Sequence, residues 1–325
     1  MKAITRSSYG SADVLELRDV DPPPVADDEV LIEVRAAAVD PGVWIMMTGR
    51  PWAVRLASGP RRPRVPILGL DVAGVISRAG ARITRFRPGD EVYGTCRSGS
   101  FAEFATAREK QLARKPPGIS FAGAAVVPVS GVTALQTVRQ AGVQSGQRVL
   151  ITGAGGGVGS FAVQLAKIAG ASVTGVCSPA KAELVRSLGA DQVIDYTSEE
   201  IDRDGPAYDV IVDLAGSRPL PLLRRAAKPR AVIALVGGGH AEGRVMGGFH
   251  RLMAAPLISL FMPQKLKGVT SFVRVPELET LTAHIESGAV TPVVGATYPL
   301  AEAAEALRDH ATSRSAGKIA LEIRH

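Results

Sequence analysis

The chain has 325 residues, of which 46% are hydrophobic and 21% charged, with 35 glycines and 22 prolines. This composition is typical of a globular protein of about two domains and excludes a disordered or collagen-like chain. The net charge of +7 is not collected in a block of the kind seen in nucleic-acid-binding tails. The densest basic run, Arg50 to Arg64, is interpreted as a solvated loop.

The two cysteines, Cys96 and Cys177, lie far apart, which excludes a disulfide scaffold and a cysteine-rich zinc site. Free cysteines indicate a reducing compartment. The first ten residues lack the apolar segment of a secretory signal. The longest strongly apolar run, 252–262, is too short to span a bilayer. We therefore expect a soluble cytoplasmic protein.

The first part of the chain contains short apolar or alternating runs separated by turn-forming residues such as Pro88-Gly89-Asp90. This pattern, with little helical periodicity, predicts a β-rich, barrel-like unit. The predicted strands are 3–5, 14–18, 29–37, 72–79, 91–94 and 101–105.

From about Ala122 the pattern changes to strands that alternate with helices, which predicts a parallel sheet. Apolar residues at helical spacing after the first of these strands predict a helix that ends at Gly170, and a shorter helix ends at Gly189. The fold class is therefore α/β with a doubly wound parallel sheet. Its predicted strands are 148–152, 172–177, 192–195, 209–214 and 231–236.

The last part of the chain breaks this alternation. Helices are predicted at 276–287 and 300–311, and a final strand at 318–323. We interpret these elements as a return to the first domain. The expected domains are 1–122 for the first part of the catalytic domain, 123–275 for the nucleotide-binding domain, and 276–325 for the return.

A glycine-rich segment follows the strand 148–152 directly and opens the next helix. It reads Gly153, Ala154, Gly155, Gly156, Gly157, Val158 and Gly159. Residues without a Cβ allow a tight turn and a close backbone approach to a diphosphate, which the N–H groups of the helix N-terminus then bind. This context predicts a dinucleotide-binding loop.

The segment after the second strand indicates which dinucleotide binds. An acidic residue there would favour NADH, but none lies between Gly159 and Glu183. Ser178 and Lys181 suit the 2′-phosphate of NADPH instead. The alternative is that Ser178 caps the following helix and Lys181 is solvated, and for Ser178 the two roles can coexist.

Several segments together resemble the medium-chain dehydrogenase/reductase superfamily, most nearly its zinc-less quinone oxidoreductase branch. The resemblance extends in collinear order over nearly the whole chain. It implies a GroES-like barrel, a Rossmann-type domain for the cofactor and a homodimer formed by extension of the cofactor sheet. The segments are 36–41, 66–74, 89–94, 99–104, 131–134, the glycine loop with 162–167, 188–191 and 317–318.

The zinc enzymes of that superfamily use cysteine and histidine ligands. The resemblance puts Asp40 where a ligand cysteine would stand, and Leu70 and Asp71 where a ligand histidine would stand. Only Cys96 lies in the stretch of the structural-zinc lobe, and the five histidines lack ligand spacing. We therefore expect no metal site.

The resemblance also suggests catalytic residues. Asp40 occupies a position that is usually asparagine in this branch, and an ionised carboxylate cannot donate to a substrate oxygen. Asp40 is expected to accept from the nicotinamide ribose or a water, or to cap a turn. Trp52 lies near a position that is tyrosine in many relatives, and it is expected to line the cleft. Trp44 is interpreted either as a cleft residue or as core.

Further cofactor contacts are implied by the resemblance. They are Thr133, before the first strand of the parallel sheet, and, after its second strand in the sequence, Tyr196, Val236, Gly237, Phe272 and Lys318. Tyr196 and Phe272 have ordinary strand packing as the alternative. The apolar segment 252–262 is interpreted as a lid, a dimer contact or a buried helix.

The function predicted from this pattern is NADPH-dependent hydride transfer to a quinone or an α,β-unsaturated carbonyl, without zinc. Such acceptors need no Lewis acid, whereas alcohol oxidation is harder to drive without one. A zinc-independent alcohol or aldehyde oxidoreductase is the second hypothesis. The third is an NADPH-bound RNA-binding or structural protein, although no basic-aromatic patch for nucleic acid is present. Neither a membrane nor a nucleic acid is expected as a partner.

Overall fold

The structure is a computed structural model that describes residues 1–236, 248–312 and 315–324. It divides into two compact units. Unit 1 comprises 1–132, 272–288 and 292–325, and unit 2 comprises 133–271 with 289–291. The first boundary falls later than the expected one at 122, because helix α3 (Phe121–Ala125) packs against strands of unit 1.

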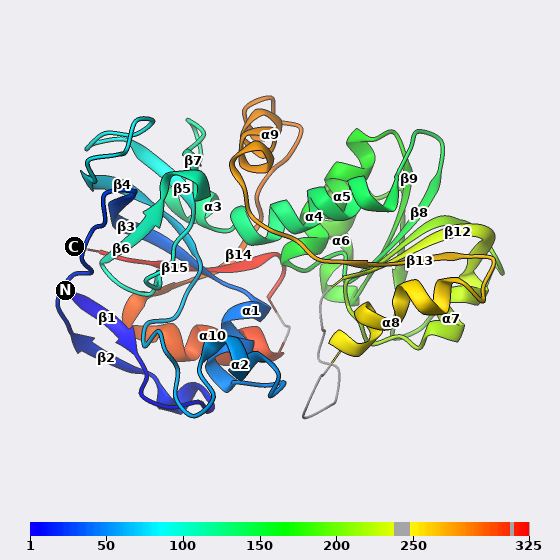
Figure 1. Cartoon of the computed structure of the whole chain (residues 1–325). Helices are drawn as coiled ribbons and strands as arrows, with labels where there is room; N and C mark the ends of the chain where they lie inside the picture. Colours follow the sequence, from blue (N-terminus) through cyan, green and yellow to red (C-terminus); the bar gives the residue numbers. More distant parts are fainter. Residues whose placement is uncertain (237–247, 313–314, 325) are drawn as a thin grey trace. The chain divides into compact units, whose positions relative to one another are not determined.

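Unit 1 contains a seven-stranded sheet in the order β14-β15-β3-β4-β5-β7, with β6 also paired to β3 (Figure 1). The first two strands form a separate antiparallel pair. The strands are β1 (Lys2–Thr5), β2 (Glu16–Asp19), β3 (Glu29–Val39), β4 (Asp71–Ala79), β5 (Glu91–Thr95), β6 (Phe104–Arg108), β7 (Leu112–Arg114), β14 (Val294–Pro299) and β15 (Lys318–Glu322).

Strand β3 is the centre of this sheet because it pairs with β4, β6 and β15. Its first half buries every second residue, including Val30, Ile32 and Val34, as the period of a strand requires. Its second half, through Val39, is buried on both faces. The end of β3 therefore enters the core and holds the residue that follows it, Asp40, in a buried position.

Unit 1 also contains helices. Besides α3 they are α1 (Pro41–Thr48), α2 (Val54–Ser58), α9 (Val275–Glu286) and α10 (Ala303–Thr312). Helices α1 and α2 were not expected from the sequence. Helix α1 begins with Pro41 and ends at Gly49, which has a φ of 60° that favours glycine.

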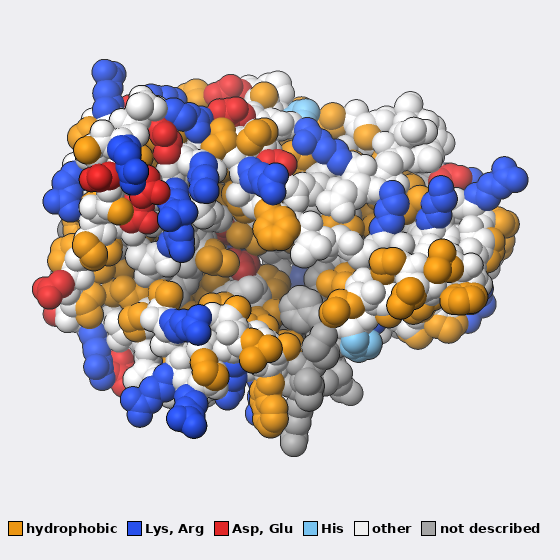
Figure 2. Space-filling model, in the orientation of Figure 1, with side chains coloured by type: hydrophobic (Ala, Val, Ile, Leu, Met, Phe, Trp, Pro, Cys, Tyr) orange, Lys and Arg blue, Asp and Glu red, His pale blue; other side chains and the backbone are white. Residues whose placement is uncertain are grey.

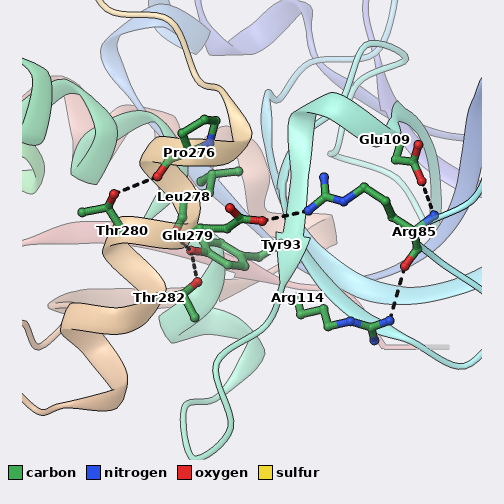
Figure 3. A network of polar contacts seen from close by, with 9 residues as sticks. All are labelled: Arg85, Tyr93, Glu109, Arg114, Pro276, Leu278, Glu279, Thr280 and Thr282. Carbon is green, nitrogen blue, oxygen red and sulfur yellow. Dashed lines mark hydrogen bonds and ion pairs between the residues drawn. The ribbon is translucent and has the colours of Figure 1, made fainter.

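Helix α9 is held on unit 1 by the polar network of Figure 3. The hydroxyl of the buried Tyr93 donates to the Leu278 carbonyl at 2.8 Å and also lies 2.8 Å from the Thr282 hydroxyl. The Arg85 guanidinium donates to Glu279 at 2.9 Å. These bonds connect β5 and the loop before it with the segment that returns from the other end of the sequence.

We predict that Tyr93→Phe will lower the free energy of unfolding by about 1–3 kcal/mol, because it leaves a buried carbonyl without its donor. Urea denaturation measures this change. Thr280→Val is the matched control, because its hydroxyl bonds only within α9, to the Pro276 carbonyl. A Tyr93→Phe protein no less stable than this control would show that the buried hydroxyl contributes nothing.

Unit 2 is built on a parallel six-stranded sheet in the order β10-β9-β8-β11-β12-β13. The predicted doubly wound fold class is confirmed. Helices α5 and α6 lie on one face of the sheet, and α7 and α8 lie on the other (Figure 1). Helix α4 (Pro128–Ala141) begins in unit 1 and continues into unit 2. The other elements of unit 2 are β8 (Arg148–Thr152), α5 (Gly157–Ile168), β9 (Ser172–Cys177), α6 (Ala182–Ser187), β10 (Gln192–Asp195), β11 (Tyr208–Asp213), α7 (Leu220–Ala226), β12 (Ala227–Val236), α8 (Phe249–Ser259) and β13 (Lys265–Val269).

The strand register brings the carboxyl ends of this sheet together. Thr152 at the end of β8 pairs with Val176 of β9, and Cys177 at the end of β9 pairs with Asp195 of β10. Ligands of open α/β sheets bind at such an edge. The glycine loop and the segments after β9 and β10 consequently follow neighbouring strands.

The apolar segment 252–262 forms most of α8 and the turn after it. It is not a buried helix, because Met253, Leu257 and Phe261 are 70%, 67% and 87% exposed. In the described part of the chain, no helix is both long and apolar enough to cross a membrane.

Candidate active site

The glycine loop joins β8 to α5 in a turn that requires glycine at Gly153 for its backbone conformation and at Gly159 for lack of space. Gly153 has a φ of 68°, which disfavours other residues. A Cβ on Gly159 would lie 2.1 Å from the Gly153 carbonyl oxygen. By contrast, a Cβ on Gly156 would meet only that oxygen, at 3.4 Å. The protein itself therefore tolerates a side chain at Gly156, and the open space there fits a bound diphosphate.

Lys181 lies against this loop. A Cβ on Gly155 would be 2.8 Å from the Lys181 Cβ and 2.9 Å from its Cδ. Ser178 precedes the 3-10 helix Pro179–Lys181, but its side chain makes no capping hydrogen bond. The alternative role of Ser178 as a hydroxyl cap is thus not observed, and its hydroxyl remains compatible with a ligand.

Tyr196 follows β10 directly, next to the segment that contains Ser178, because Asp195 pairs with Cys177. The Tyr196 side chain is 53% exposed, so it is not buried by ordinary strand packing. The structure thus places Ser178, Lys181 and Tyr196 at the same edge of the sheet as the glycine loop. Their contact with a cofactor stays a prediction.

We predict that Lys181→Ala will weaken NADPH binding by about tenfold or more, because a charged hydrogen bond is worth about 1.5–3 kcal/mol. NADH, which lacks the 2′-phosphate, should be unaffected. Ser178→Asp should repel NADPH and accept a hydrogen bond from the ribose of NADH. Fluorescence titration with both cofactors checks this, and an equal loss for both would show that these residues do not recognise the phosphate.

The other expected cofactor residues lie on separate segments of the chain. The Thr133 hydroxyl lies 2.7 Å from that of Ser271. Val236 is the last residue of β12, and Gly237 lies outside the described residues. Phe272 is 63% exposed and belongs to unit 1.

Asp40 is the N-cap of α1. Its Oδ1 accepts hydrogen bonds from the Gly42 and Val43 amides at 2.7 and 3.2 Å. The cap expected as one of its roles is therefore present. The second oxygen, Oδ2, is buried and has no hydrogen-bond partner among the described residues. Trp52, by contrast, is 53% exposed, while Trp44 packs against the core of unit 1.

Lys318 was expected to close over the nicotinamide. In the structure its ammonium is buried and paired with the buried carboxylate of Asp71. The other oxygen of Asp71 accepts from the Val129 amide at 3.0 Å. The pKa of Asp71 is raised to about 6: burial raises it most, the charge of Asp40 also raises it, and the ammonium and the Val129 amide oppose the rise. The charged end of Lys318 is thus already occupied within unit 1.

These contacts do not fit a zinc site. The two carboxylates that stand at the ligand positions have other contacts: Asp40 caps a helix through Oδ1, and Asp71 pairs with an ammonium. Burial raises the pKa of Cys96 to about 12, which keeps the thiol neutral, whereas zinc binds the thiolate. No three side chains of ligand type come together in the residues that the structure describes. Independence from zinc stays a prediction.

The sequence analysis missed Asp213, the buried residue at the end of β11. One of its oxygens accepts from the Thr152 hydroxyl at 2.8 Å and from the Gly216 amide at 3.3 Å. Arg251 of α8 lies 3.4 Å from the other oxygen and donates to the Gly216 carbonyl at 2.6 Å. This network supports the same edge of the sheet, and no local motif indicated it.

Comparisons with known proteins agree with this arrangement. The family model for the alcohol dehydrogenase GroES-like domain matches residues 26–137, and that for the zinc-binding dehydrogenase matches residues 188–321.

Two curated plant proteins are similar over nearly the whole chain. An NADPH-dependent alkenal/one oxidoreductase of Arabidopsis thaliana is 36% identical over 98% of this chain and 78% of its own length. A 2-methylene-furan-3-one reductase of Solanum lycopersicum is 34% identical over 99% of this chain and 79% of its own length. Among solved structures, the quinone oxidoreductase from Coxiella burnetii has a TM-score of 0.87 at 26% identity, covering 100% of this chain and 99% of its own.

Proposed function

The chain belongs to the medium-chain dehydrogenase/reductase superfamily, in its quinone oxidoreductase branch, and we propose that it is an NADPH-dependent reductase of quinones or α,β-unsaturated carbonyl compounds that needs no zinc. The observation that carries the cofactor assignment is the glycine loop, with open space at Gly156 and Lys181 against Gly155. The substrate class rests on the likeness to the alkenal/one and furanone reductases.

Unit 2 supplies the residues that would hold NADPH. The amides of the glycine loop and the N-terminus of α5 suit the diphosphate, and Ser178, Lys181 and Tyr196 suit the phosphorylated ribose. When bound, NADPH supplies the hydride. The chain's own part is to bind, orient and exclude water.

Unit 1 supplies the residues proposed for the substrate. Asp40 holds the start of α1 through Oδ1 and leaves the buried Oδ2 as an acceptor for a ligand hydroxyl or water. Trp52 offers an exposed aromatic surface for an apolar acceptor. No Lewis acid polarises the carbonyl in this proposal, so the acceptor itself must be electron-poor, as quinones and enones are.

The test measures NADPH oxidation with panels of quinones, enones and aldehydes, before and after chelation, with zinc determined by elemental analysis. We expect turnover of quinones or enones, unchanged by chelation. Turnover restricted to aldehydes and dependent on added zinc would overturn the proposal. Lack of any turnover, together with salt-sensitive RNA binding, would favour a non-enzymatic role instead.

We also propose that the protein is a homodimer assembled through unit 2. Strand β13 is the edge of the sheet, and no described strand pairs with its free side. Beside it, α8 packs on β13, and apolar side chains gather over this helix (Figure 2). An apolar patch beside an unpaired edge strand suits an isologous contact between two copies.

Light scattering coupled to size exclusion tests the dimer. Leu257→Glu with Phe261→Glu should yield monomers, because both side chains are largely exposed in one copy. A wild-type monomer at micromolar concentration would contradict the assembly. The cytoplasm is proposed as the compartment because Cys96 and Cys177 are free and buried, and cell fractionation tests that assignment.

A further inference from the structure

A surface of unit 1 carries positive charge without matching carboxylates. Between Asp40 and Asp71 the sequence contains five arginines and no aspartate or glutamate. Arg50, Arg61, Arg62 and Arg64 are all exposed. None of these four forms an ion pair with any residue that the structure describes. The charge is therefore available to an external anion.

Three of these arginines lie on one short loop, Gly59–Arg64, which we call the arginine loop. Gly59 has a φ of 120°, and a Cβ there would lie 2.1 Å from the Arg62 carbonyl oxygen, so that the loop closes on itself tightly. The Arg64 amide donates to the Ser58 carbonyl at 2.9 Å. The loop is thus fastened to the C-terminal end of α2.

A second set of contacts anchors the loop to Tyr9. The Tyr9 hydroxyl donates to the Gly59 carbonyl at 2.7 Å and lies 2.8 Å from the Ser58 hydroxyl. The guanidinium of Arg55 lies over the Tyr9 ring at 4.6 Å, and its Nε donates to the Gly49 carbonyl at 2.9 Å. The backbone of the arginine loop is consequently positioned before any ligand binds, which lowers the entropic cost of binding.

Exposed apolar side chains accompany the charge. Trp52 and Leu56 are 53% and 80% exposed and flank or lie on α2. Helix α2 is only five residues long, about 7 Å. Little more than this short helix separates the arginine loop from Trp52 along the chain. The proposed function assigns Trp52 to binding of the acceptor.

We propose that the arginine loop binds the phosphate groups of the substrate, so that the preferred acceptor is an enoyl compound with a phosphorylated tail, such as a thioester of coenzyme A. This inference rests on the proposed function, because it concerns a substrate of the same reaction. Arginine suits phosphate because its planar group donates two parallel hydrogen bonds. The exposed side chains of Trp52 and Leu56 suit the part of the substrate that joins its phosphates to the enoyl group.

The experiment compares two substrates with the same reacting group: crotonyl coenzyme A and the neutral crotonyl thioester of N-acetylcysteamine. At low salt, wild type should have the higher kcat/KM for the coenzyme A thioester, and added salt should reduce this preference. Arg61→Ala with Arg62→Ala should raise KM for crotonyl coenzyme A about fivefold to tenfold. It should leave kcat and the neutral thioester unchanged, because the lost contacts bind ground and transition states equally.

Two further variants serve as controls. Arg61→Lys with Arg62→Lys keeps the charge and should recover most of the affinity. Arg82→Ala with Arg87→Ala removes the same charge from unit 1 at side chains that are 70% and 86% exposed, and it should behave as wild type. Equal kcat/KM for both thioesters in wild type, or an equal effect of both alanine pairs, would overturn the inference.

Other outcomes separate this inference from the proposed function. Turnover of the neutral thioester without any preference for crotonyl coenzyme A would leave the reductase assignment standing and remove the phosphate site. If neither thioester were reduced, equilibrium dialysis with free coenzyme A would still test the phosphate site. Loss of coenzyme A binding in Arg61→Ala with Arg62→Ala would support the site, and unchanged binding would refute it. Binding of phosphatidylglycerol vesicles through the arginine loop, without a thioester preference, would assign the surface to lipid instead.

Discussion

Lys318→Met should lower the free energy of unfolding by about 3–5 kcal/mol at pH 8, because it leaves the Asp71 carboxylate buried without a counter-charge. Both side chains of the pair are almost completely buried, at 3% and 0% exposure. The Val129 amide is then the one remaining hydrogen-bond donor that the structure shows for Asp71. Urea denaturation of the variant and wild type measures the difference.

The loss should depend on pH in a defined direction. The pKa of Asp71 in the folded protein, about 6, lies above its ordinary value of 3.8. Because the folded protein holds this proton more tightly than the unfolded chain, protonation of Asp71 stabilises the folded state. This stabilisation is complete below pH 3.8 and is lost as the pH rises through 6. Removal of the ammonium raises this pKa further, so that Asp71 is mostly neutral at pH 5 in the variant. Lys318→Met should therefore be less destabilising at pH 5 than at pH 8.

The double variant, Asp71→Asn with Lys318→Met, separates charge from packing. It removes both charges, so it should recover most of the stability at pH 8 and lose the pH dependence. If the single variant were equally destabilised at both pH values, the loss would come from packing, and the buried pair would not be the cause.

The nucleotide-binding strands could be predicted closely from the sequence. The ranges 148–152, 172–177 and 192–195 are the bounds of β8, β9 and β10. The first two are short, largely apolar runs of buried parallel strands, the third is the edge strand beside them, and turn-forming glycines delimit the two helices between the three strands. The local signal and the tertiary environment agree there, which is why the prediction succeeds.

Other elements carry no such local signal. Helix α1 is apolar on nearly every side, so its residues show no helical period, and its start depends on the Asp40 cap. Strand β13 alternates lysines with small and apolar residues and depends on its pairing with β12. Both elements are defined by what they contact rather than by their own pattern.

The candidate site divides in the same way. The glycine loop is a contiguous motif, and Ser178 and Lys181 follow from the strand order that it predicts. The pair of Asp71 and Lys318 joins residues 247 positions apart. The resemblance suggested a cofactor contact for Lys318 and only placed Asp71 at a zinc-ligand position, and it paired neither residue with the other. Long-range pairs of this kind become visible only when β15 is placed in the sheet with β3 and β4.

Gly156→Val should abolish most NADPH binding while the protein stays folded. Gly156 has an extended backbone, with φ −93° and ψ −178°, that valine adopts without strain. Its Cβ would meet only the Gly153 carbonyl oxygen, at 3.4 Å, which is an ordinary contact. The added methyl groups would instead occupy the space assigned to the diphosphate. Loss of two or more charged hydrogen bonds corresponds to about a hundredfold or more in affinity.

Gly159→Ala provides the contrast. Its Cβ would lie 2.1 Å from the Gly153 oxygen and 2.7 Å from the Ala154 Cα, so that the turn itself must move. This variant should lower the free energy of unfolding by about 1–3 kcal/mol, as overpacking does, whereas Gly156→Val should change it little. Fluorescence titration with NADPH and thermal unfolding, measured on both proteins, distinguish the two effects. A Gly156→Val protein that bound NADPH as wild type does would show that the loop is only a structural turn, because the open space at Gly156 would then face no ligand.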